Sequence, residues 1–161
     1  MATNLNFEDW LALTQLHADY ASAVDSGHWD LWPEFFTDDG VYRLQPRENH
    51  ERGFPLATLA FTSKGMLKDR VYGIQQTLFH DPYYQRHVVG APVIRSVDAE
   101  GRIHCEAHYA VFRTKLSEVS TVFNVGRYLD VVVRTPAGLK FARRECIYDS
   151  EMIPNSIIYP I

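Results

Sequence analysis

The side chains able to do chemistry in this 161-residue sequence include seven histidines and two cysteines. His104 and His108 are four residues apart, a spacing that on a helix would bring two imidazoles to one metal ion. Apolar residues alternate through this segment, which predicts a strand, and four strand residues span about 13 Å. One ion cannot bridge that gap without a third element, so we interpret both as histidines on the polar face of a strand.

Cys105 and Cys146 both fall in strand-like segments, where a buried reduced thiol is the usual outcome. A mixed His and Cys iron-sulfur cluster takes its two Cys and two His ligands from a Cys-x-His paired with a Cys-x-x-His, and this pair of motifs is absent. A mononuclear iron site needs two histidines and a carboxylate, and the histidines here are spread along the chain. We therefore expect this chain to bind neither a metal nor another cofactor.

A second kind of chemistry involves Asp25, Tyr42, His87 and Arg144. If the first helix packs inside a bent sheet, the end of that helix and the inward strand positions line one cavity. A carboxylate facing an imidazole there could act as a general acid and base, as in a small dehydratase or isomerase. The alternative is that Asp25 caps or pairs and His87 is an ordinary core histidine, and the sequence leaves both interpretations open.

Apolar spacing indicates which elements position these residues. Helices are expected from the Asn6 cap to Asp25, from His28 to Phe36, and from the Ser63 cap to Leu78. Strands are expected at Val41–Gln45, Gln85–Val97, Arg102–Lys115, Ser120–Val133 and Leu139–Asp149, with a polar loop at Pro46–Pro55. The second half of the chain is thus nearly all β.

This order of elements predicts an α+β fold with one domain, residues 1–161. Turns ending in Gly101 and Gly138 suit hairpins, so the neighbouring strands should be antiparallel. We expect the N-terminal helices to pack in a curved antiparallel sheet. This arrangement resembles the cystatin-like cone of nuclear transport factor 2.

Composition narrows the classes of partner. The net charge is −4 and the basic residues are scattered, so no nucleic-acid-binding surface is expected. Met1–Asp9 lacks the pattern of a signal peptide, and no stretch approaches the roughly 20 apolar residues that span a bilayer. We therefore expect a cytoplasmic protein that is not bound to membranes.

Several motifs together resemble the small subunit of Rieske-type aromatic-ring hydroxylating oxygenases. The matching residues are Asp25, Trp29, Trp32-Pro33, Phe35-Phe36, Asp39, Tyr42, Gly65-Met66-Leu67, Asp69-Arg70, Tyr84 to His87, Gly126, Tyr128-Leu129-Asp130, Arg144, Asp149 and Pro160-Ile161. The segments Trp32–Phe36, Glu48–His50 and Met66–Arg70 are most similar to the salicylate 5-hydroxylase and terephthalate dioxygenase branch. The segments Pro46–Pro55 and Phe79–Gln85 depart from the pattern.

The resemblance implies a non-catalytic assembly subunit of an oxidoreductase, a monooxygenase or dioxygenase acting on a carboxylated aromatic substrate such as salicylate. The Rieske [2Fe-2S] cluster and a mononuclear iron would lie in a large-subunit partner. Copies of this chain would form a trimeric base, often in a trimer of heterodimers, and a ferredoxin or reductase would be an indirect partner. No nucleic acid or membrane partner is implied.

Aromatic and guanidinium side chains are enriched at subunit interfaces, and they give five candidate interface residues. These are Tyr83, Tyr84, Arg86, Tyr159 and Ile161. Two alternatives to an assembly subunit stay open: a stand-alone dehydratase or isomerase using Asp25 and His87, and an oligomeric binding module.

Overall fold

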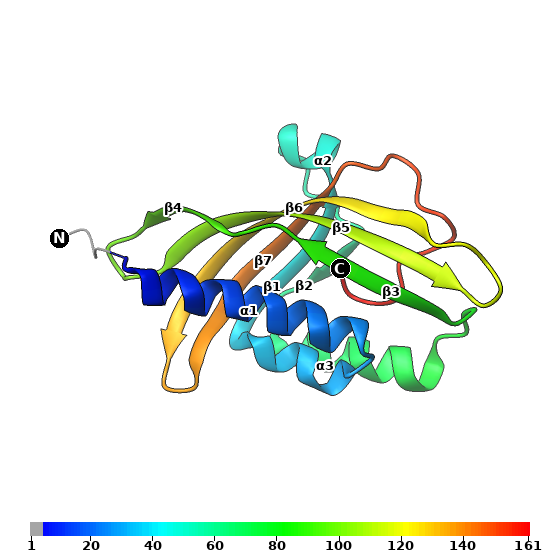
Figure 1. Ribbon diagram of the computed structural model, residues 1–161, viewed down its shortest axis with the longest axis horizontal. Helices are drawn as coiled ribbons and strands as arrows, with labels where there is room; N and C mark the ends of the chain where they lie inside the picture. The colour runs from blue at the N-terminus through cyan, green and yellow to red at the C-terminus, as the bar shows by residue number, and fades with distance from the viewer. Residues whose placement is uncertain (1–4) are drawn as a thin grey trace.

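The computed structural model describes residues 5–161. Residues 1–4 lie outside the described part. The expectation that Met1–Asp9 is not a signal peptide therefore falls partly outside the described residues. The chain forms one curved sheet with helices on its concave side, as Figure 1 shows. The α+β cone predicted from the sequence is confirmed.

The helices begin and end close to the predicted points. Helix α1 covers Phe7–Asp25, and the Asn6 and Asp9 side chains cap it reciprocally. A 3-10 turn, Trp29–Phe35, replaces the expected second helix. Helix α3 covers Lys64–Tyr72 after the Ser63 cap and continues as a π-helical turn, Gly73–Thr77.

The strands also follow the alternation of the sequence, with two differences. The strands are β1 Phe36–Pro46, β2 Leu59–Phe61, β3 Tyr83–Val89, β4 Val93–Val97, β5 Ile103–Lys115, β6 Thr121–Thr135 and β7 Gly138–Tyr148. The expected run Gln85–Val97 is divided into β3 and β4, because Pro92 has no N–H to donate to the strand ladder. The polar loop at Pro46–Pro55 contains a short helix, α2 (Arg47–Glu51), which stands apart from the cone in Figure 1.

The sheet order is β2-β1-β7-β6-β5-β3, and β4 also pairs with β5. The expectation of an antiparallel sheet is wrong for one pair: β1 runs parallel to β7, with Tyr42 opposite Arg144. The other pairs are antiparallel. The parallel pair joins the first strand to the last, so a long part of the chain connects them, as parallel neighbours require.

Helix α1 and the inward side chains of β5, β6 and β7 enclose the core. The buried face of α1 includes Leu13, His17, Tyr20 and Val24. No helix of the described residues is long and apolar enough to cross a membrane.

Candidate functional site

A buried ion pair lies at the centre of the cone. Asp130 on β6 and Arg144 on β7 are directly opposite in the sheet register. The guanidinium donates from Nε (3.0 Å) and Nη2 (2.8 Å) to the two carboxylate oxygens, a bidentate geometry. Aromatic rings surround the cation, with its central carbon 4.2 Å from the Tyr20 ring centre and 3.9 Å from that of Tyr128.

Burial and pairing act in opposite directions on these two charges. Burial raises the pKa of the Asp130 carboxyl, and the charge of Arg144 opposes that rise. Burial also disfavours the charged guanidinium, but Asp130 outweighs it and keeps the pKa of Arg144 above its ordinary value. Each group therefore depends on the other to stay charged inside the protein.

His17 on α1 completes this group. Its Nδ1 lies 3.0 Å from Nη2 of Arg144, and its Nε2 lies 3.4 Å from the Asp130 carboxylate. A guanidinium only donates, so Nδ1 accepts and the ring proton belongs on Nε2, facing Asp130. Burial, followed by the charge of Arg144, lowers the pKa of His17 well below 6.5. His17 is thus a neutral imidazole that bridges helix and sheet.

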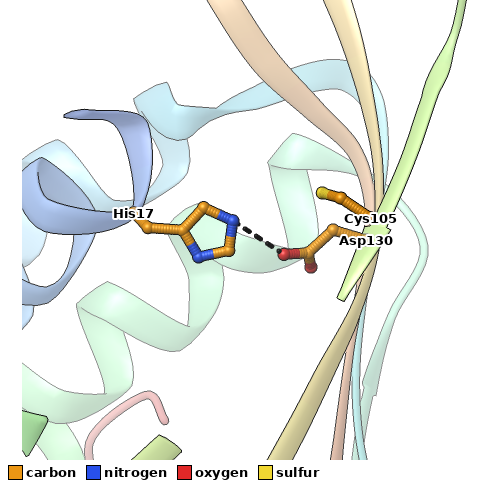
Figure 2. A group of neighbouring side chains, drawn as sticks. All are labelled: His17, Cys105 and Asp130. Carbon is orange, nitrogen blue, oxygen red and sulfur yellow. Dashed lines mark ion pairs between the residues drawn. The ribbon is translucent and has the colours of Figure 1, made fainter. Parts of the chain in front are cut away.

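Figure 2 shows His17 and Asp130 with Cys105, whose sulfur completes a set of possible metal ligands. One donor atom from each of the three residues lies within 4.8 Å of the others. The chemistry of this set does not fit a divalent cation, because Arg144 already neutralises the only carboxylate and would repel a second cation. Burial also raises the pKa of the Cys105 thiol, which keeps it protonated.

A second polar contact lies where α1 ends. The Asp25 carboxylate contacts His87 Nδ1 at 2.6 Å and accepts from the His87 backbone N–H at 2.7 Å. The two side chains are 3% and 0% exposed, respectively. The other ring nitrogen, Nε2, is buried and has no hydrogen-bond partner among the described residues. A carboxylate that orients an imidazole in this way could support proton transfer if a substrate reached Nε2.

The four residues suggested for acid-base chemistry do not form one group. Asp25 and His87 contact each other, and Arg144 binds Asp130 and His17. Tyr42 lies opposite Arg144 in the register of β1 and β7, but its hydroxyl binds the backbone of Ile161.

The interior of the cone is occupied by the chain itself. We call Ile157–Ile161 the closing segment. Its last residue is 0% exposed, and its carbonyl accepts from the hydroxyl of Tyr20 at 2.8 Å and that of Tyr42 at 3.3 Å. The Gln85 amide donates to the carbonyl of Pro160 at 2.9 Å. A chain segment thus fills this part of the interior.

The five interface candidates lie in different surroundings. Tyr84 and Arg86 are exposed on β3. Tyr83 and Tyr159 are half-buried, and their ring centres are 4.5 Å apart. Ile161 is part of the chain's own core. The assignment of these five residues to a subunit interface stays a prediction.

The histidines considered as a metal pair face different surroundings. His104 Nε2 lies 3.0 Å from the Asp98 carboxylate, next to a hairpin turn, and His108 is exposed. The sequence reasoning missed the role of His17. The only signal was a histidine on the apolar face of the first helix, and its partners depend on strand register.

Comparisons with known proteins agree with the fold and identify the family. The SnoaL-like domain model matches residues 6–145, so the chain belongs to the SnoaL-like family. The anthranilate 1,2-dioxygenase small subunit of Burkholderia cepacia is 31% identical, covering 97% of this chain and 96% of that protein. Within the SnoaL-like fold, the chain therefore belongs to the small subunits of aromatic-ring dioxygenases.

Two further relatives support this assignment. The beta 1 subunit of the terminal oxygenase component of terephthalate 1,2-dioxygenase from Comamonas sp is 28% identical, covering 94% of this chain and 97% of that protein. A crystal structure from Novosphingobium aromaticivorans, assigned as the beta subunit of an aromatic-ring-hydroxylating dioxygenase, is 32% identical with a TM-score of 0.86. The alignment covers 94% of this chain and 96% of that structure.

Proposed function

We propose that this chain, a single domain over residues 1–161, is the assembly subunit of a multicomponent aromatic-ring oxygenase. The observation that carries the proposal is the closed interior, in which Ile161 fills the cone and Arg144 is neutralised by Asp130. An interior of this kind stabilises a rigid support, and the open hollow of about 230 Å³ beside Asp25 is not lined by His87. The family assignment agrees with such a role.

In this proposal the large subunit holds the Rieske cluster and the mononuclear iron. Small subunits would form a trimeric base in a trimer of heterodimers, and the ferredoxin or reductase would reach only the large subunit. The assembly would be cytoplasmic. Anthranilate and terephthalate, in the names of the relatives, are both aromatic carboxylates, which supports a carboxylated aromatic substrate such as salicylate.

We further propose that the exposed face of β3 contributes to the subunit contacts. Tyr84 is 76% exposed, and it lies with Arg86 and Phe112 along a hollow of about 460 Å³. Large aromatic and guanidinium groups at a concave surface are typical of interface cores. The other three candidates pack against their own chain, so they would support this face from behind without contacting the partner. These are Tyr83, Tyr159 and Ile161.

Co-expression with and without the matching large subunit tests the assembly role. We expect the large subunit to be isolated as an active, defined oligomer only when this chain is present. Size-exclusion chromatography with light scattering gives the stoichiometry, and substrate-dependent oxygen uptake gives the activity. A large subunit that assembles correctly and is fully active alone would contradict the proposal.

The 2.6 Å contact between Asp25 and His87 favours a second candidate, a stand-alone dehydratase or isomerase. In that case Asp25→Asn and His87→Gln should each abolish turnover by the isolated chain. If both variants instead leave the reconstituted oxygenase unchanged, and the isolated chain turns over no substrate, the second candidate is wrong.

A further inference from the structure

The closing segment, Ile157–Ile161, differs from the rest of the core in how it is held. It belongs to no helix or strand, and the preceding residues, 149–156, are mostly exposed. Its polar anchors are hydrogen bonds with side chains instead of strand pairing, such as those from Arg70 Nη2 to the carbonyls of Ile157 (3.1 Å) and Ile158 (2.9 Å). Its release would therefore break no pair of the sheet.

The inner end of this segment lies against a group of converging donors. The carbonyl oxygen of Ile161 accepts from the hydroxyls of Tyr20 and Tyr42 and from the thiol of Cys146 at 3.5 Å. The Tyr20 hydroxyl in turn accepts from the Trp32 indole N–H at 3.0 Å, which strengthens it as a donor. Three donors aimed at one oxygen form a site for a carbonyl or carboxylate group.

The walls around these donors are aromatic. The ring of Tyr42 lies 5.2 Å from that of Trp32 in an edge-on arrangement and 6.1 Å from that of Phe61 in a stacked one. The Arg144 cation lies behind Tyr20, with its central carbon 4.2 Å from the ring centre. Because Asp130 neutralises this cation, the three donors, and not a net positive charge, would hold the oxygen of a ligand.

The same core also contains buried polar atoms that have no hydrogen-bond partner among the described residues. Among the described residues, Arg144 Nη1 and the Tyr128 hydroxyl are buried and make no hydrogen bond, although both side chains are fully buried. Such atoms are uncommon in a native core unless water or a ligand can reach them.

We propose that the cone contains a latent binding site for a small aromatic acid, and that the closing segment occupies this site in the absence of the acid. The carboxylate would replace the Ile161 carbonyl at the hydroxyls of Tyr20 and Tyr42. The ring would replace the Ile161 side chain among the aromatic walls. The ligand then competes with an intramolecular occupant, so its apparent affinity is reduced by the fraction of chains in which the segment has left.

Calorimetric titration of the purified chain with benzoate tests this competition. Ile161→Gly weakens the occupant and should lower the apparent Kd of benzoate by about tenfold or more, since the open fraction rises. Met152→Ala is the matched control, because its side chain is 86% exposed in the segment before the occupant, and it should bind as the wild type does. An Ile161→Gly variant that binds benzoate no more tightly than the wild type overturns the proposal.

Two further measurements do not depend on that comparison alone. Adding Tyr42→Phe to the Ile161→Gly variant removes a donor and should weaken benzoate binding; unchanged binding would place the benzoate elsewhere.

In the wild type, saturating benzoate should speed hydrogen exchange of the Ile161 amide, which donates to Tyr42 at 3.0 Å, while the Tyr128 amide in β6 stays protected. No acceleration at Ile161 contradicts the proposal. Assembly with the large subunit is a separate readout, so either proposal can fail alone.

Discussion

At the scale of single residues, the buried group of His17, Asp130 and Arg144 determines what the interior can do. Its members satisfy one another across α1, β6 and β7. Removing one member of such a pair leaves a buried charge unpaired, which typically costs about 3–5 kcal/mol. The group therefore acts first as a polar link between the helix and the sheet.

The pKa of His17 leads to a prediction about acid stability. In the fold the imidazole stays neutral well below pH 6.5, whereas in the unfolded chain it takes up a proton near that pH. The unfolded state thus binds more protons below pH 6.5, and this residue makes stability fall as the pH falls from there. The slope it contributes is at most about 1.4 kcal/mol per pH unit.

We expect His17→Gln to flatten the pH dependence of the unfolding free energy between pH 6.5 and 5. Urea denaturation at several pH values measures it. The titratable groups facing His17 are Arg144, Asp130, Cys105 and Tyr128, all retained in the variant. His108→Gln, at an exposed site, should keep the wild-type slope. If His17→Gln also keeps it, the neutral buried imidazole is not the cause.

At the scale of elements, two glycines should respond in opposite ways to the same change. A Cβ on Gly126 in β6 would lie 2.1 Å from the Ile147 carbonyl oxygen, so β6 and β7 would have to separate. A Cβ on Gly65 in α3 meets only the Ser63 hydroxyl oxygen, at 3.6 Å. The sheet therefore needs its glycine, and the helix does not.

Gly126→Ala should lower the unfolding free energy by roughly 1–3 kcal/mol, as overpacking of a core does. Gly65→Ala should raise it by about 0.5 kcal/mol, because alanine loses less backbone freedom on folding. Urea denaturation of both variants side by side measures the two signs. A neutral Gly126→Ala would mean that β6 and β7 pair more loosely at this point than the register indicates.

At the scale of the whole molecule, the sequence predicts the elements better than their partners. Alternation and capping residues locate α1 and most strands, because both signals are local. The parallel pairing of β1 with β7 cannot be predicted from local sequence patterns. It depends on the order of the strands in the sheet, where β7 lies between β1 and β6. Arg144 was a candidate site residue, but its bond to His17 requires the position of α1 over the sheet. The burial of Ile161 likewise could not be predicted locally, because it depends on helices and strands that are distant in the sequence.

The assembly role leads to a prediction at this same scale. Tyr84 and Arg86 project from β3, where a change of charge disturbs no core packing. Tyr84→Glu and Arg86→Glu should each leave the melting temperature of the isolated chain within about 2 °C of wild type, as exposed substitutions usually do. Both should reduce the amount of large subunit that co-purifies with the chain, because a new carboxylate would be buried at the contact.

The matched control for these variants is Glu100→Lys. Glu100 lies in the turn between β4 and β5, at the opposite end of β5 from the residues that pair with Tyr84 and Arg86. Its change of charge is as large as that of Arg86→Glu and opposite in sign, so this variant shows whether a change of two charges at a distant site by itself disturbs co-purification. Loss of the large subunit with only the β3 variants would support that face as the contact. Full co-purification with Tyr84→Glu and Arg86→Glu would exclude it and direct the search to the exposed residues around α2.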